Sequence, residues 1–100
     1  MKSIIQTEKV CFLCGCCTPT GYYDGLEEHH IFFGRSNRKH SEKRGLKVWL
    51  CGETCHRNGK RSAHRNRETD LYLKRIGQAA YEETYGDRAA FIAEFGRSYL

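Results

Sequence analysis

The sequence predicts a small α+β fold in which two short strands precede two helices. Residues 26–33 end in Ile-Phe-Phe before Gly34, and strand-forming residues that stop at a glycine indicate a β-strand. Over 46–50, Leu, Val and Leu occupy alternate positions, which indicates a second strand with one buried face. The run 35–45 between them is polar and basic without an apolar period, so we expect a surface loop there.

Two helices are expected in the C-terminal part of the chain. Residues 68–85 have apolar side chains at helical spacing and acids in the first turn, and Gly86 follows as a stop. Asp87 can cap a last helix, whose apolar stripe falls over 91–95. The sequence has no internal repeat and no linker rich in Pro, Gly or Ser, so we expect a single domain.

A chain of this length needs help to hold its core. One hundred residues bury proportionally little surface, so a structural metal or disulfides are expected to supplement the packing. The sequence has no apolar stretch near the roughly 20 residues of a membrane span and no secretory signal, so we expect a cytoplasmic protein without a membrane partner. In a reducing cytoplasm, cysteines mixed with histidines favour metal ligation, and a disulfide framework is the minority alternative.

Two cysteine pairs have spacings typical of zinc knuckles. Cys11 and Cys14 form a C-x2-C pair, whose thiolates can converge on one ion from a tight turn. Cys51 and Cys55 form a second pair at the end of the second strand, although three residues separate them where two are more usual. Together the four predict a tetrahedral structural Zn²⁺ site. The spacing leaves open Cys16 and Cys17 as alternatives in the first pair, and His56 in place of Cys55.

Positive charge is concentrated in the middle of the chain. The whole sequence has 17 Lys and Arg against 12 Asp and Glu, but positions 35 to 67 hold eleven of these cations and two of the acids. This segment is therefore +9 and the remainder −4. A basic run alone is most often a solvated surface, but beside a cluster of His and Cys it favours phosphate binding. The side chains expected to contact nucleic-acid phosphates are Arg35, Arg38, Lys39, Arg57, Lys60, Arg61 and Arg65.

An adjacent pair of histidines lies near the end of the first predicted strand, in the run LEEHHIFFG. A lone strand histidine is usually a hydrogen-bonded structural residue. Neighbouring side chains on a strand point to opposite faces, but a local bend at the strand end can direct one toward a metal and the other toward a water. Because His29 and His30 are also flanked by Glu27 and Glu28, the pair favours chemistry.

The runs CFLC, EEHHIFFG, LKVWLC and CHRNGKRSAH, within residues 11–64, resemble the HNH endonucleases. The run HHIFFGRSNRKHSEKRGLKVWLC, with KRIGQ downstream, is similar to small phage-encoded members related to the phage recombination-enhancing nuclease. The resemblance implies a zinc-stapled ββα-metal core, HNH or treble-clef-like, over about 11–66, with helices over about 67–100 of a single 1–100 domain. It also implies a metal-dependent DNA endonuclease in the cytoplasm of a phage-infected or lysogenic bacterium.

The resemblance assigns roles position by position. His30 matches the general base, and His29 matches the metal ligand that precedes it. His64 is the first choice for the metal-binding histidine after the second cysteine pair, and His56 is the second. Asn37 is the nearest candidate for the middle asparagine, and it can equally be a turn residue or a phosphate contact. The cofactors implied are the structural Zn²⁺ and one catalytic divalent ion, which can be Mg²⁺, Mn²⁺, Ni²⁺ or Zn²⁺.

Two other classes of function stay open at this point. A non-catalytic zinc-ribbon protein would keep the cysteines and the basic segment, but it would not need His29, His30 and His64 to converge. A protein-interaction adaptor would present an exposed apolar helix face. The resemblance also implies a recombinase filament or another phage protein as a partner besides DNA. Because no segment looks like a base-reading helix, we expect low sequence specificity.

Overall fold

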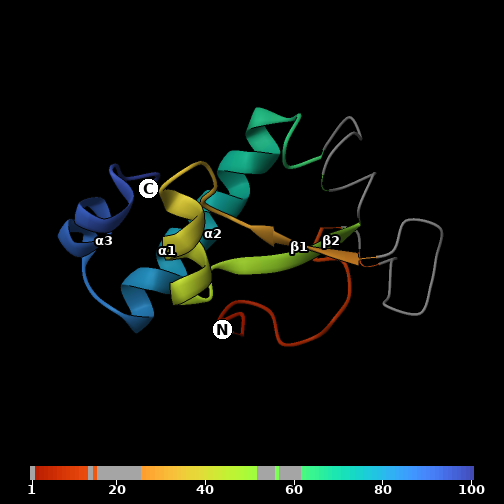
Figure 1. Cartoon of the computed structure of the whole chain (residues 1–100), viewed down its shortest axis with the longest axis horizontal. Coiled ribbons are helices and arrows are strands. Elements are labelled where there is room, and N and C mark those ends of the chain that lie inside the picture. The colour runs from red at the N-terminus through yellow and green to blue at the C-terminus, as the bar shows by residue number, and fades with distance from the viewer. Residues whose placement is uncertain (1, 14, 16–25, 52–55, 57–61) are drawn as a thin grey trace.

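The structure is a computed structural model and combines a two-stranded sheet with three helices (Figure 1). The residues that it describes are 2–13, 15, 26–51, 56 and 62–100. The elements are β1 (Leu26–His30), α1 (Asn37–Arg44), β2 (Lys47–Cys51), α2 (Arg67–Thr84) and α3 (Arg88–Phe95). The predicted α+β class is therefore confirmed, and so are both strands and both C-terminal helices. Within the described residues, no helix has the length and apolar character needed to cross a membrane.

The two strands pair antiparallel, although α1 lies in the connection between them, and we call this pair the hairpin. Its register decides which side chains share a face. His29 pairs with Val48, whereas His30 pairs with Lys47 and Glu28 pairs with Trp49. Since side chains alternate along a strand and directly paired residues share a face, the hairpin has two distinct sides. One side contains His29 and Val48. The other contains Glu28, His30, Lys47 and Trp49.

The expected loop over 35–45 is wrong, because most of this segment forms α1. The helix sequence NRKHSEKR contains no apolar residue, so it has no hydrophobic period to detect. Polar contacts hold it instead: the buried Ser41 hydroxyl donates to the Leu46 carbonyl, and Arg44 pairs with Glu94 of α3 at 2.9 Å. Gly45 ends the helix at φ 70°, where a Cβ would collide with the Lys2 carbonyl oxygen.

The helices α2 and α3 begin at side-chain caps. Asn66 Oδ1 accepts from the Thr69 amide at 3.0 Å at the start of α2. Asp87 accepts from the Ala90 amide at 2.9 Å, as predicted for the last helix. Within α2, Gly77 lets the helix approach the segment after β1 closely, since a Cβ there would lie 2.9 Å from the Phe32 ring.

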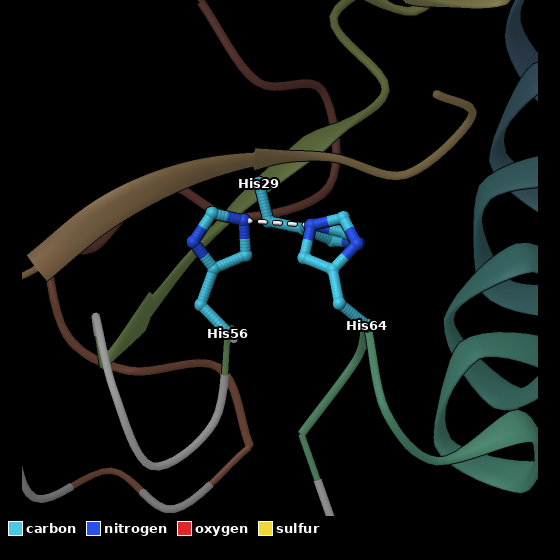
Figure 2. Close-up of side chains that lie close together, drawn as sticks. All are labelled: His29, His56 and His64. Atoms are coloured by element: carbon cyan, nitrogen blue, oxygen red, sulfur yellow. Dashed lines mark hydrogen bonds between the residues drawn. The ribbon is translucent and has the colours of Figure 1, made fainter. Parts of the chain in front are cut away.

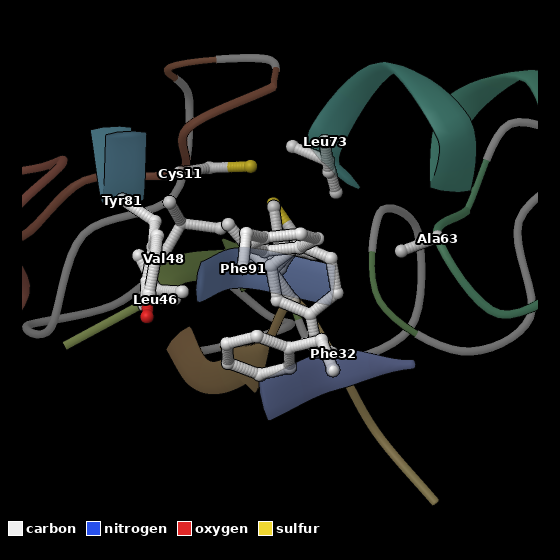
Figure 3. Packing of buried hydrophobic residues seen from close by; sticks show 12 residues of the cluster. Cys11, Phe32, Leu46, Val48, Ala63, Leu73, Tyr81 and Phe91 are labelled. Atoms are coloured by element: carbon white, nitrogen blue, oxygen red, sulfur yellow. The ribbon is translucent and has the colours of Figure 1, made fainter. Parts of the chain in front are cut away.

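The core lies where α2 and α3 meet the end of β1 (Figure 3). The first strand ends at His30 and not at residue 33, because Ile31 and Phe32 turn into this core, where they are 0 % and 1 % exposed. Phe32 packs on Phe91 with ring centroids 5.2 Å apart. This aromatic packing fixes the end of the hairpin that carries the histidine pair.

Candidate metal centre

Three histidines converge on the Val48 side of the hairpin (Figure 2). They come from separate parts of the sequence: His29 lies on β1, His56 follows β2, and His64 lies just before α2. One ring nitrogen from each lies within 4.8 Å of the other two. Backbone bonding supports the arrangement, since the His64 amide donates to the His56 carbonyl at 3.2 Å. The structure therefore contains a group of imidazoles that could hold a metal ion.

His29 is the least satisfied member of the group. Its side chain is 1 % exposed, and both ring nitrogens are buried without a hydrogen-bond partner among the described residues. Burial, reinforced by the neighbouring His56 and His64, lowers the pKa of His29 to about 3. The ring is consequently neutral at physiological pH, with a lone pair facing two other imidazoles. A metal bond to one of the nitrogens would satisfy a group that burial otherwise penalises.

His56 is oriented by a carboxylate. Its Nδ1 lies 2.9 Å from Glu27 Oε1. Because a carboxylate only accepts, Nδ1 carries the hydrogen and Nε2 keeps the lone pair. That Nε2 lies 3.2 Å from His64 Nε2. Two nitrogen ligands about 2.0–2.1 Å from a tetrahedral ion would be roughly 3.3–3.4 Å apart, so the spacing suits shared coordination. Burial and His56 also lower the pKa of His64, which favours its neutral, ligating form.

A carboxylate that orients a metal-binding histidine is a recurring arrangement in metal sites. The role of Glu27 could not be assigned from its position in the sequence, because its partner lies 29 residues away. One signal was available: Glu27 and His29 are two residues apart on a strand and therefore share a face. The structure also brings both His56 and His64 to the group, whereas the sequence analysis gave His64 as the first choice and His56 as the second.

Phe33 and Lys74 border the three histidines. The exposed Phe33 ring lies 4.8 Å from the His64 ring and 5.9 Å from the His29 ring, measured between centroids. Lys74 of α2 places its ammonium 4.5 Å from the Phe33 ring centroid and pairs with Asp70 at 2.8 Å. Asp70 Oδ1 is buried and has no hydrogen-bond partner among the described residues. Sequence reasoning missed both members of this pair, which appear in the sequence as an ordinary helical ion pair at i and i+4.

His30 lies on the other side of the hairpin. Its Nε2 is 2.7 Å from Glu42 Oε1, and the Lys47 ammonium lies 3.0 Å from the same carboxylate and 3.1 Å from Glu28. Glu28, His30 and Glu42 form a second group with ligand atoms within 4.8 Å of one another. In this group the Lys47 ammonium already supplies the positive charge. The structure thus separates His30 from His29, and the general-base role of His30 stays a prediction.

Asn37 is the first residue of α1, and its side chain makes a long hydrogen bond of 3.5 Å to the Phe95 carbonyl of α3. This contact joins two helices, and it does not bring Asn37 into the group of three histidines. Its role as the middle asparagine also stays a prediction.

The zinc site predicted at the cysteines is only partly described. Cys11 and Cys51 are buried, at 2 % and 1 % exposure, within the apolar core. Cys51 is disulfide-bonded, and a disulfide sulfur is not a thiolate ligand, so a four-thiolate zinc site would require this bond to be reduced. Cys14 and Cys55 lie outside the described residues. The structural zinc therefore stays a prediction for the reduced chain.

Of the seven residues predicted to contact phosphates, the structure describes four. Arg35, Arg38 and Lys39 are exposed at α1, and Arg65 is exposed beside His64. Arg57, Lys60 and Arg61 lie outside the described residues.

Comparison with known proteins adds no identity, because no protein-family description, curated protein or solved structure matches this chain.

Proposed function

We propose that this chain is a metal-dependent DNA endonuclease of the HNH type, with one divalent ion held by His29, His56 and His64. The proposal is carried by the ring nitrogens of His29, which are buried without a hydrogen-bond partner among the described residues and face two other imidazoles. Three histidine ligands would fill three positions of a tetrahedral or larger coordination shell. At least one position would then stay open for water or substrate, as catalytic sites require. An ion at this position would act as a Lewis acid toward the phosphate and its leaving oxygen.

The chain's own residues have distinct tasks under this proposal. Glu27 fixes the tautomer and direction of His56. Lys74 keeps a positive charge beside the site, where a phosphate would gain from it. The exposed cations Arg35, Arg38, Lys39 and Arg65 would hold the DNA backbone without reading base identity, so cleavage would have low sequence specificity.

An experiment can identify the residue that accepts a proton from the attacking water. The family resemblance gives this role to His30, whereas strand alternation turns His30 away from His29. We expect His30→Ala to keep the metal affinity of the wild type, because its ring belongs to the Glu42 group. If plasmid nicking is then lost, His30 is assigned as the base. If nicking persists, His30 is removed from the mechanism.

The proposal is tested by metal titration and by nicking of supercoiled plasmid with Mg²⁺, Mn²⁺ or Ni²⁺. His64→Ala removes an exposed member of the group, so the fold should survive. His40→Ala is the matched control, because His40 is 40 % exposed and pairs with Glu94 at 3.1 Å. We expect His64→Ala to lose metal binding and nicking together, and His40→Ala to keep both. Equal nicking by both variants would contradict the proposal, and DNA binding without cleavage would favour the non-catalytic zinc-ribbon alternative.

A further inference from the structure

The Trp49 side of the hairpin carries two hollows that meet at Glu28. The first, of about 420 Å³, lies against the N-terminal segment, and the second, of about 580 Å³, lies against α1. We call the two together the hairpin groove. The first is lined by Lys2, Gln6, Lys9, Lys47 and Trp49, among others. The second is lined by His30, Arg35, Arg38, Lys39, Glu42 and Lys43, among others.

The hairpin groove has an excess of positive charge. Its two acids, Glu28 and Glu42, both pair with the Lys47 ammonium, at 3.1 and 3.0 Å. Elsewhere in the described chain, three helix cations are paired with acids, Arg44 with Glu94, Lys74 with Asp70 and Arg88 with Glu82, whereas Arg67 and Arg75 are not paired with a described acid. The groove differs in the number of such cations that it gathers, because six exposed ones form no ion pair with any described residue. They are Lys2, Lys9, Arg35, Arg38, Lys39 and Lys43.

An aromatic ring lies at one end of the hairpin groove. Trp49 is partly exposed, and the Lys9 ammonium lies 4.5 Å from its ring centroid, which shows that a cation can reach this ring from the groove. The Trp49 backbone is fixed, since its amide donates to Gln6 Oε1 at 2.8 Å and its carbonyl accepts from the Phe12 amide at 2.8 Å. An aromatic ring carried on a fixed backbone, beside cations that have no ion pair among the described residues, is a combination that binds single-stranded nucleic acids, because bases stack while phosphates pair.

We propose that the hairpin groove binds a single strand of nucleic acid, with a base stacked on Trp49 and phosphates on the cations of α1. A duplex offers the same phosphates, but its bases are stacked on one another and have no free face for Trp49. The inference rests on the proposed function in taking nucleic acid as the ligand, and it uses Arg35, Arg38 and Lys39, which the proposed function also assigns to the nucleic-acid backbone. It places this strand on the opposite side of the hairpin from His29.

The test uses the full chain in excess chelator, so that binding is measured without metal or cleavage. Trp49 is the only tryptophan, so its fluorescence reports directly on the groove. We expect a poly(dT) oligonucleotide to quench this fluorescence, and a duplex of equal length to quench it much less. Because each phosphate contact in a single strand contributes a salt slope of about −0.7, Lys39→Gln combined with Lys43→Gln should flatten the slope by about 1.4.

Variants of the ring separate stacking from charge. With a labelled oligonucleotide, we expect Trp49→Leu to weaken binding about tenfold and Trp49→Tyr to restore most of it, because tyrosine retains a stacking face. Arg97→Gln is the charge control, since Arg97 is exposed and contacts Tyr99 at the C-terminus. Unchanged binding by Trp49→Leu, or equal affinity and quenching for duplex and single strand, would overturn the proposal. RNA in place of DNA tests which sugar is preferred.

The outcomes for the groove and for the metal centre are distinguishable. His64→Ala should bind the oligonucleotide in chelator as the wild type does, because His64 lies outside the groove. A chain that binds through Trp49 but never nicks plasmid contradicts the nuclease and keeps the groove. A chain that nicks with metal, but whose Trp49 and lysine variants bind as the wild type does, keeps the nuclease and removes the groove.

Discussion

His29 and His30 are neighbours in sequence, yet they lie in opposite environments. His29 is buried and faces His56 and His64, and neither of its ring nitrogens has a hydrogen-bond partner in the part of the chain that the structure describes. His30 is bonded to Glu42 at 2.7 Å, beside an ammonium group that balances the local acids. Strand alternation puts the two side chains on opposite faces, and the return of the chain brings His56 and His64 to only one of them. An adjacent pair of the same residue can therefore belong to two sites, one made of neutral imidazoles and one whose acids are already paired with an ammonium group.

The largest expected effect tests whether His29 and His30 belong to two different sites. We expect His29→Gln to lower the affinity for Ni²⁺ or Co²⁺ by more than about 100-fold, because losing a ligand should exceed the 10–100-fold cost of losing an outer-shell partner. The same substitution at His30 should change affinity less than about threefold. Calorimetric titration of both variants, with far-ultraviolet circular dichroism as the folding control, checks the pair. Equal losses would show that the two histidines serve one site.

The neighbouring residues Glu27 and Glu28 give a second test of the two sides of the hairpin, with a smaller expected effect. Glu27 holds His56 on the His29 side, whereas Glu28 pairs with Lys47 on the other side. We therefore expect Glu27→Gln to weaken metal binding about tenfold, because a second-shell carboxylate is lost. Glu28→Gln should leave the metal affinity as in the wild type. Titration with Co²⁺ followed by visible absorption distinguishes them, and equal behaviour would argue against an orienting role for Glu27.

How much the sequence could predict depends on whether the signal is local. The strands, the Asp87 cap and the two C-terminal helices carry their own periodicity and caps, and these were predicted within a few residues. The polar helix α1 has no such signal, since it is held by polar contacts: Ser41 bonds to Leu46 just beyond the helix, and Arg44 pairs with Glu94 of α3, 50 residues away. The histidine pair was visible as a motif. Its division between two faces, and the joint use of His56 and His64, required the register and the return of the chain.

The third prediction concerns pH, where the burial of His29 should appear as stability. In the unfolded chain this imidazole takes up a proton near pH 6.5, whereas burial and its histidine neighbours lower the folded-state pKa to about 3. Between these values the unfolded state binds more protons, so the free energy of unfolding falls as pH decreases below 6.5. The contribution is on the order of 1 kcal/mol per pH unit, and it is fully present above 6.5.

Urea unfolding of the metal-free chain, measured in chelator from about pH 7 to about pH 4, isolates this contribution. We expect His29→Gln to have a shallower decline than the wild type, because glutamine does not titrate. Parallel curves for the two proteins would mean that the His29 nitrogens are already satisfied in solution, which would remove the physical reason for placing a metal there.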